Sequence, residues 1–433
     1  QLGVSPTFNL LTSVMDDMRP ENKYLHLMDE QEAITKAQAL LNRPGDANVS
    51  PLAVYRHAAK ADSVQQRRPN VVLIMMESMS AKFMKHFGQS ETLTPFLDSL
   101  YTRSISFRNF YSAGIHTNHG LYATLYSFPA MMKRNLMKGS VIPRYSGLPT
   151  VLKENGYYNL FFMTHEGQYD NMNAFFRTNG YDEVFSQENY PADKVVNSFG
   201  VQDDFLYDYA IPVLNQRAAT GQPFFATLLS ISNHPPYVIP PFFHPKTSEP
   251  ETQIVEYADW ALRQFFEEAR KQPWFDNTIF VLEGDHGKLV GDAECELPES
   301  YNHIPLMIYS SRIQPEEKTA FGGQVDIQPT ILGLLNIDYL QNNFGVDLLK
   351  EERPCMFYTA DNMIVGRNDT LLYLYNYETQ QEFTYHIDNG KLKAVPMDDR
   401  FLPLKEYSFS MLQSAEFLVK HGKTLNSIPF TQQ

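Results

Sequence analysis

The feature that most constrains the fold is a run of six apolar residues that ends in an acid. Residues Val71 to Met76 are all apolar, and Glu77 follows them directly. A short, continuous apolar run predicts a strand that is buried on both faces of a sheet. Similar runs occur at residues 159–164, 224–232, 278–284 and 304–310. The chain therefore carries the strands of a largely buried sheet.

The segments between these strands have the spacing of amphipathic helices. The helix candidates are residues 94–104, 120–128, 148–156, 203–218, 254–272 and 326–336. Buried strands that alternate with helices predict a mainly parallel sheet sandwiched by helices. The fold class is therefore α/β.

The two ends of the chain differ from this alternating pattern. Residues 1–68 predict a helical lead-in and a linker, and residues 69–345 a catalytic α/β domain. Residues 346–433 predict a small C-terminal subdomain, with an antiparallel meander over 370–395 that contains a DNG turn, and a final helix over 408–422.

Charge and cysteine content narrow the function classes. The formal net charge is −14 and there is no sustained run of Lys or Arg, which argues against nucleic acid as a partner. The two cysteines, Cys295 and Cys355, do not have the spacing of metal ligands, and whether they pair is left open.

Several polar side chains lie at the carboxyl ends of the predicted strands. They are Glu77, His165, Asn233, His234, Asp285 and His286. In parallel α/β folds, ligands bind beyond the carboxyl ends of the strands. An Asp oxygen and an imidazole nitrogen are both good ligands for Mn²⁺ or Zn²⁺. The alternatives are an ordinary turn at Asp285 and His286, and a helix cap at Glu77.

Thr117 comes just before a predicted helix and lies between Gly114 and Gly120. A hydroxyl at a helix N-terminus sits in a positive field that favours an alkoxide and an incoming phosphate. The alternative is a plain N-cap. A cation held by Glu77, Asp285 and His286 would lower the pKa of the Thr117 hydroxyl and make it a nucleophile.

The joint order of four motifs resembles a known family. The motifs are MMES (75–78), HTNHG (116–120), SNHPPY (232–237) and GDHG (284–287). From about Asn70 to Asn336 the chain resembles the lipoteichoic acid synthase and phosphoglycerol transferase family, within the alkaline phosphatase and sulfatase superfamily. The resemblance implies an alkaline-phosphatase-like fold and one divalent cation, bound by Glu77, Thr117, Asp285 and His286. Mn²⁺ is common in this family, with Zn²⁺ or Mg²⁺ as alternatives.

The resemblance also implies the substrate contacts. His234 matches a histidine that binds the substrate phosphate, and the segment 163–182 places His165 and Arg177 on the phosphate and glycerol. This segment departs from the family, because Phe175 stands where a Trp is usual and the spacing from His165 to Arg177 is longer. His303 is similar to a histidine that phosphoethanolamine transferases use near their zinc, which leaves a second metal or another head group open.

The implied activity is a transfer through phospho-Thr117. Phosphoglycerol would move from phosphatidylglycerol, a membrane phospholipid, to a glycan, glycolipid or polymer acceptor. The catalytic domain would be extracytoplasmic at the cell membrane, with an anchor upstream of Gln1. The alternatives are a phosphoethanolamine transferase, a phosphodiesterase, a sulfatase-like hydrolase and a catalytically inactive binding protein. Neither cysteine has the C/S-x-P-x-R context of a sulfatase. We expect Glu283 to support the site or the turn rather than bind the cation. We expect Lys288 to be solvated, with a phosphate contact as the alternative.

Overall fold

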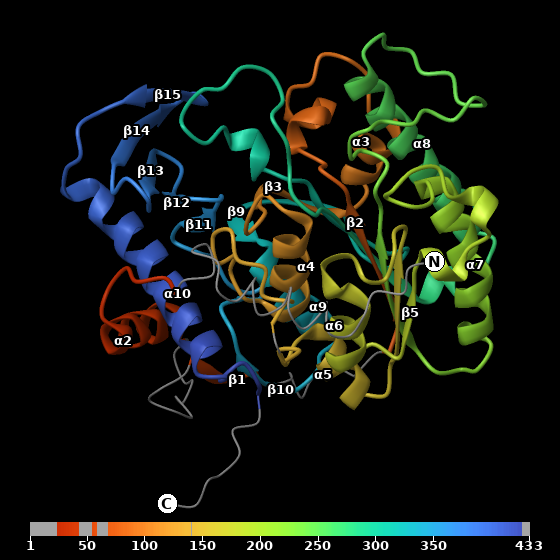
Figure 1. The fold of residues 1–433 in the computed structure, drawn as a ribbon, viewed down its shortest axis with the longest axis horizontal. Coiled ribbons are helices and arrows are strands. Elements are labelled where there is room, and N and C mark those ends of the chain that lie inside the picture. Colours follow the sequence, from red (N-terminus) through yellow and green to blue (C-terminus); the bar gives the residue numbers. More distant parts are fainter. Residues whose placement is uncertain (1–23, 43–53, 59–67, 140, 427–433) are drawn as a thin grey trace, which may run out of the picture.

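The computed structural model describes residues 24–42, 54–58, 68–139 and 141–426. An eight-stranded sheet with the order β5-β4-β6-β2-β7-β8-β3-β9 forms its centre (Figure 1). Its strands are β2 (Asn70–Met76), β3 (Ile105–Tyr111), β4 (Tyr158–Met163), β5 (Glu183–Phe185), β6 (Phe224–Leu229), β7 (Thr278–Gly284), β8 (Leu306–Tyr309) and β9 (Glu316–Gly323). Only β8 runs antiparallel to its neighbours, so the predicted mainly parallel sheet is confirmed.

Strand β2 lies inside the sheet and explains why its sequence is apolar throughout. All seven of its residues are buried, and it pairs in parallel with β6 on one side and β7 on the other. Successive side chains of a strand point to opposite faces. Accordingly Val71, Leu73 and Met75 join one hydrophobic core, and the alternate residues join the other.

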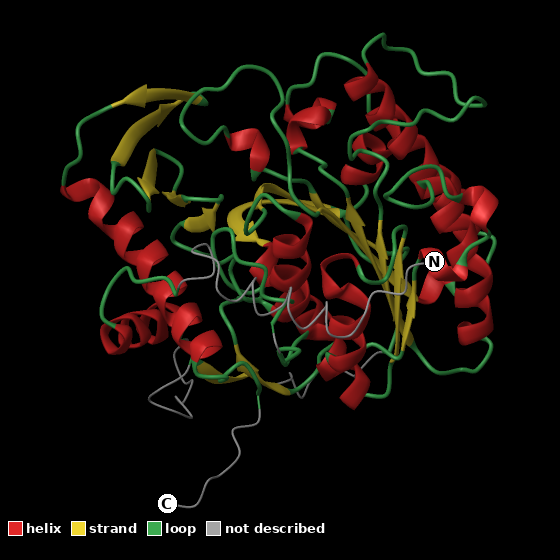
Figure 2. Ribbon diagram, viewed as in Figure 1, coloured by secondary structure: helices red, strands yellow, loops and turns green. Residues whose placement is uncertain are grey.

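Helices cover both faces of the sheet (Figure 2). The core on one face includes residues of α4 (Thr117–Tyr126), α5 (Leu148–Glu154), α6 (Met172–Thr178) and α9 (Ile327–Leu334). The core on the other face includes residues of α3 (Pro95–Tyr101), α7 (Asp203–Ala218) and α8 (Pro250–Ala269). The predicted sandwich of a sheet between helices is therefore confirmed.

The C-terminal part forms a separate antiparallel sheet, as predicted. Its five strands are β11 (Met356–Thr359), β12 (Met363–Arg367), β13 (Leu371–Asn376), β14 (Glu382–Asp388) and β15 (Lys391–Ala394). The sheet begins earlier than the predicted meander over 370–395, because β11 and β12 precede that segment. The last helix, α10 (Leu402–Lys420), contacts β11 and β12.

Two described segments near the N-terminus pack onto later parts of the chain. Helix α2 (Glu30–Leu41) lies against α10, and β1 (Tyr55–Ala58) pairs antiparallel with β10 (Tyr339–Asn342). Most of the predicted linker lies outside the described residues, and the domain division stays a prediction. Among the described helices, none combines the length and apolar character that crossing a bilayer requires. Both cysteines are free thiols.

Candidate active site and metal centre

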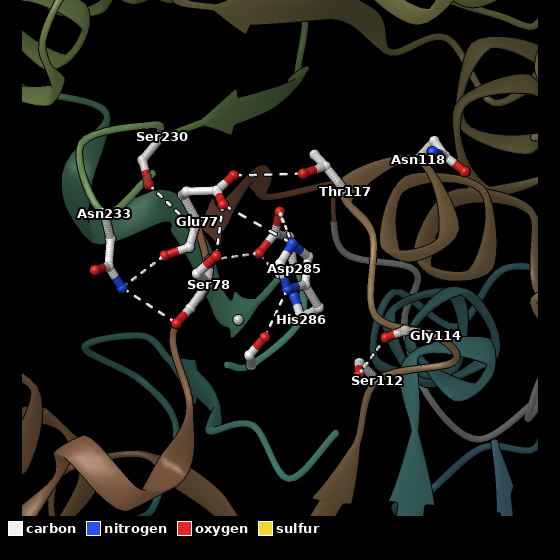
Figure 3. Close-up of polar contacts among 12 residues, drawn as sticks. Glu77, Ser78, Ser112, Gly114, Thr117, Asn118, Ser230, Asn233, Asp285 and His286 are labelled. Carbon is white, nitrogen blue, oxygen red and sulfur yellow. Dashed lines mark hydrogen bonds and ion pairs between the residues drawn. The ribbon is translucent and has the colours of Figure 1, made fainter. Parts of the chain in front are cut away.

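Two neighbouring strands bring three side chains that can hold a metal to one point. In the parallel pair β2–β7, Met76 lies opposite Gly284, so Glu77 and Asp285 leave the sheet at the same level. One ligand atom from each of Glu77, Asp285 and His286 lies within 4.8 Å of the others (Figure 3). The predicted strand-end cluster thus exists in the fold.

The electrostatics of this cluster favour a bound cation. Glu77 and Asp285 are 1% and 0% exposed. Burial, together with the charge of Asp285, raises the pKa of Glu77 to about 7. Although burial opposes it, the charges of Asp285 and Glu77 raise the pKa of His286. The buried Asp285 Oδ2 makes no hydrogen bond. Two carboxylates and an imidazole fit Mn²⁺, Zn²⁺ or Mg²⁺, so these residues fit the implied metal.

A shell of hydrogen bonds fixes the carboxylates. The Ser78 hydroxyl donates to Glu77 Oε1 at 2.6 Å, and the Ser78 N–H donates to Asp285 Oδ1 at 2.8 Å. The Glu77 N–H donates to the Ser230 hydroxyl at 3.0 Å. Asn233 Nδ2 donates to the backbone oxygens of Glu77 and Ser78 at 3.2 and 3.1 Å. Outer contacts of this kind orient metal ligands.

Thr117 is the first residue of helix α4, after His116 at the N-cap. Its hydroxyl donates to Glu77 Oε2 at 3.3 Å, so the side chain faces the metal cluster (Figure 3). The close approach of α4 depends on Gly120, because a Cβ at this position would lie 2.3 Å from the carbonyl oxygen of Asp285. A hydroxyl thus lies beside a buried carboxylate and at a helix N-terminus, an arrangement in which a nearby base and the helix field can activate a hydroxyl.

Two predicted phosphate ligands, His165 and His234, come after strands β4 and β6, which precede β2 in the order of the sheet. His165 is 2% exposed, burial lowers its pKa, and its ring lies 4.6 Å from that of Tyr169. Asn233, which precedes His234, donates to the backbone of Glu77 and Ser78, and the His234 ring lies 4.0 Å from that of Phe199. His234 Nδ1 contacts the Pro235 carbonyl at 2.6 Å, which fixes the ring and leaves Nε2 for a ligand.

Arg177 and His303 are held by other parts of the protein. Arg177 Nε donates to Asn173 Oδ1 at 2.8 Å, on its own helix. His303 Nε2 contacts the Arg108 carbonyl at 2.8 Å, and its ring stacks on Tyr111. The structure does not place either side chain in the metal cluster, so their substrate-binding roles remain predictions.

Sequence reasoning missed polar residues around Thr117. Asn118 Nδ2 donates to Asp170 Oδ2 at 3.3 Å, and Lys138 Nζ lies 2.9 Å from Asp170 Oδ1. Asp170 and Asn171 have φ values of 49° and 62°. Asp and Asn adopt this left-handed conformation more readily than most residues, so the Asp-Asn pair after His165 was a usable signal.

The expectation of a solvated Lys288 was wrong. Its Nζ donates to Asn233 Oδ1 at 2.6 Å and to the Tyr237 hydroxyl at 3.1 Å, and burial lowers its pKa to about 8. Glu283 lies outside the metal cluster, where its Oε1 accepts a 2.5 Å hydrogen bond from the Thr124 hydroxyl of α4.

A mainly parallel sheet between helices, with a hydroxyl and a carboxylate–histidine cluster at its carboxyl edge, defines an alkaline-phosphatase-like protein. The pattern of the sulfatase family matches residues 69–337, and the chain belongs to this family.

Several known proteins are similar to this chain. Lipoteichoic acid synthase 2 of Bacillus subtilis (strain 168) is 24% identical over 315 residues, covering 65% of this chain and 47% of that protein. Lipoteichoic acid synthase 1 of the same organism is 25% identical over 354 residues, covering 75% of this chain and 54% of that protein. The chain spans about half the length of the curated relatives it matches.

Solved structures share the fold. A protein of the alkaline phosphatase superfamily from Vibrio parahaemolyticus superposes with a TM-score of 0.82 at 26% identity, covering 93% of this chain and 98% of that one. The lipoteichoic acid synthase LtaP from Listeria monocytogenes superposes with a TM-score of 0.70 at 21% identity, covering 84% of this chain and 96% of that one. The similarity to the first structure therefore extends over both sheets.

Proposed function

We propose that this chain is the catalytic part of a metal-dependent transferase, which moves phosphoglycerol from phosphatidylglycerol to an acceptor through a phospho-Thr117 intermediate. The observation that carries the proposal is the hydrogen bond from the Thr117 hydroxyl to Glu77, a buried carboxylate of the metal cluster. The names of the lipoteichoic acid synthases that it resembles support the choice of head group.

Glu77, Thr117, Asp285 and His286 would hold one divalent cation, and Mn²⁺ is our first choice. When bound, such a cation favours the alkoxide form of a coordinated hydroxyl and neutralises charge on phosphate oxygens. Glu77 accepts the hydrogen bond of the Thr117 hydroxyl, and the N-terminus of α4 adds a positive field. His165 and His234 bind the phosphate oxygens of the donor.

The reaction has two steps that balance. In the first, the Thr117 hydroxyl gives up its proton, its Oγ1 forms a bond to the phosphorus, the bond from phosphorus to the diacylglycerol oxygen breaks, and that oxygen takes up one proton. In the second, a hydroxyl of a glycan, glycolipid or polymer acceptor gives up its proton and bonds to the phosphorus, the bond from phosphorus to Thr117 Oγ1 breaks, and Oγ1 takes up one proton. Because the donor is a membrane lipid, we place the reaction at the extracytoplasmic face of the cell membrane.

The test is release of diacylglycerol from head-group-labelled phosphatidylglycerol with Mn²⁺ present. Thr117→Ala should lower turnover by about 10³-fold or more and abolish labelling of the protein, whereas Thr117→Ser should keep part of both. Thr102→Ala is a matched control, because Thr102 is exposed at the end of α3.

Full turnover by Thr117→Ala would contradict the proposed nucleophile. If only phosphatidylethanolamine or a soluble phosphodiester reacts, the proposed head group is wrong.

A further inference from the structure

A sharp turn after β2 sets the positions of both carboxylates in the metal cluster. Ser78 has a φ of 50°, in the left-handed region that few residues other than glycine adopt. From this position its hydroxyl donates to Glu77 Oε1, and its N–H donates to Asp285 Oδ1. A backbone conformation of this kind persists only where the surrounding structure holds it. The geometry of the metal cluster therefore depends on the groups that hold the turn at Ser78.

The amide of Asn233 holds this turn from the end of a neighbouring strand. Asn233 is 2% exposed, and its Nδ2 donates to the carbonyl oxygens of Glu77 and Ser78 at 3.2 and 3.1 Å (Figure 3). The amide must keep its Nδ2 toward these two carbonyls, because a rotation by 180° would bring Oδ1, an acceptor, against two other acceptors. A group that fixes the orientation of the Asn233 amide therefore also fixes the turn.

Lys288 holds the other side of this amide. Its Nζ donates to Asn233 Oδ1 at 2.6 Å and to the Tyr237 hydroxyl at 3.1 Å. The ammonium also lies 5.3 Å from the ring centre of Phe83 and 4.9 Å from that of Tyr237, at the distance of cation–π contacts. Because a lysine ammonium is only a donor, it bonds to Oδ1 of the amide and not to Nδ2. Lys288 and the two carbonyls therefore select the same orientation of the Asn233 amide.

The three segments that meet at this amide follow three adjacent strands. The order in the sheet is β6-β2-β7, and Asn233 follows β6, Ser78 follows β2 and Lys288 follows β7. The hydrogen bond from Lys288 to Asn233 thus joins the segments on either side of β2, and Asn233 bonds to the turn between them. The strand ends that carry the metal cluster are tied together by this one chain of hydrogen bonds.

We propose that Lys288 is a positioning residue of the metal centre, which acts through Asn233 on the turn at Ser78. The inference rests on the proposed function, in which Glu77 and Asp285 bind the divalent cation. Loss of a positive charge beside a cation site would by itself strengthen cation binding. Loss of a residue that orients the ligands weakens cation binding instead. The sign of the effect therefore separates positioning from simple electrostatics.

The test is binding of Mn²⁺ to the metal-free protein, measured from the electron paramagnetic resonance signal of free Mn²⁺. Lys288→Met should raise the Kd for Mn²⁺ by about tenfold. Asn233→Ala should raise it at least as much, and Lys288→Met should add nothing in the Asn233→Ala background, because both act on the same turn. Lys82→Met is the matched control, since Lys82 also comes soon after β2 but its Nζ pairs with Glu294 at 3.5 Å. Near-UV circular dichroism of each metal-free variant checks that it is folded.

Three outcomes would overturn the positioning role. The first is an unchanged or lower Kd for Mn²⁺ in Lys288→Met, and with a higher KM for phosphatidylglycerol it would assign Lys288 to the substrate phosphate instead. The second is a double variant in which the two effects multiply, because Lys288 would then not act through Asn233. The third is an equal rise of the Kd in Lys82→Met.

Failure of the proposed function gives a different result. A wild type that binds Mn²⁺ but does not release diacylglycerol from phosphatidylglycerol contradicts the proposed reaction, and the Kd values still decide the role of Lys288. A wild type that binds no Mn²⁺ contradicts both proposals.

Discussion

Glu77 and Asp285 are two acids buried side by side, and this arrangement carries a cost when no cation neutralises it. Replacing Glu77 with Gln removes one buried charge and keeps the shape. Because the pKa of Glu77 is raised from 4.5 to about 7, the cost is absent below pH 4.5, grows as the pH rises between these values and is complete above about pH 7. We predict that Glu77→Gln raises the metal-free free energy of unfolding at pH 8 by about 1 to 3 kcal/mol.

The same substitution should abolish the rise in Tm that Mn²⁺ produces, because one metal ligand is lost. Thermal unfolding with and without Mn²⁺ measures both effects. Glu283→Gln is the matched control, since Glu283 is equally buried but bonds to Thr124. A Glu77→Gln protein that still gains stability from Mn²⁺ would show that the cation binds elsewhere.

At the residue scale, the positions that could be predicted from the sequence are those of side chains that directly follow a buried strand. Glu77 and Asp285 follow neighbouring strands, so their meeting follows from the parallel pairing alone. The position of Arg177 depends instead on the path of the chain after His165, which includes two residues in the left-handed region. The residue pattern and spacing of the sequence do not determine the path of such a loop, so the position of Arg177 could not be predicted.

Helix α4 is the element that links the nucleophile to the metal cluster. A Cβ on Gly120 would lie 2.3 Å from the Asp285 carbonyl, and backbone cannot give way as a flexible side chain can. We predict that Gly120→Ala moves α4, lowers turnover of phosphatidylglycerol by at least about tenfold and destabilises the protein by about 2 kcal/mol. Steady-state kinetics and urea unfolding provide the measurements.

Gly390→Ala serves as a comparison for Gly120→Ala. Gly390 has a φ of +74°, and a Cβ at this position would meet no other atom within 4 Å, so the substitution strains the backbone without crowding. It should cost about 1 kcal/mol and leave turnover unchanged. Normal activity in Gly120→Ala would show that α4 tolerates the displacement.

At the element scale, the apolar runs of the sequence predicted the strands that are buried at every residue. They missed strands that combine buried and exposed residues. β2, β6 and β7 are buried at every residue, and their apolar runs identify them. β9 begins with exposed charged residues, and β3 contains Arg108 and Asn109 where it is only partly buried. These two strands form one edge of the sheet, where solvent permits polar side chains.

For the whole molecule, Glu299 joins the two sheets. It accepts hydrogen bonds from the Tyr111 hydroxyl of β3 and from Arg367 of β12. Burial opposes its ionisation, but Arg367, His303 and Tyr111 outweigh burial and lower its pKa to about 2. We predict that Glu299→Gln lowers the free energy of unfolding at pH 7 by about 2 kcal/mol, because it leaves the Arg367 charge without its partner.

The pH dependence of the free energy of unfolding shows whether ionised Glu299 stabilises the fold. A folded-state pKa below the ordinary value of 4.5 means that the stabilisation is present above pH 4.5 and is lost as the pH falls toward 2. Urea unfolding at pH 7, 4 and 3 should show a smaller decline in Glu299→Gln than in the wild type. Glu378→Gln, which breaks the exposed pair with Lys133, should show no measurable change. Parallel declines in all three proteins would contradict the role of Glu299.

The central position of β2 also has a consequence for biosynthesis. β2 leaves the ribosome before β7, which is one of its two partners, and Asn70 and Thr278 are 208 residues apart. At a synthesis rate of about 5 to 20 residues per second, an apolar strand waits about 10 to 40 s for that partner. An unpaired strand of this kind is an aggregation hazard. The placement that brings Glu77 to Asp285 thus leaves one edge of an apolar strand of the nascent chain unpaired until β7 has been made.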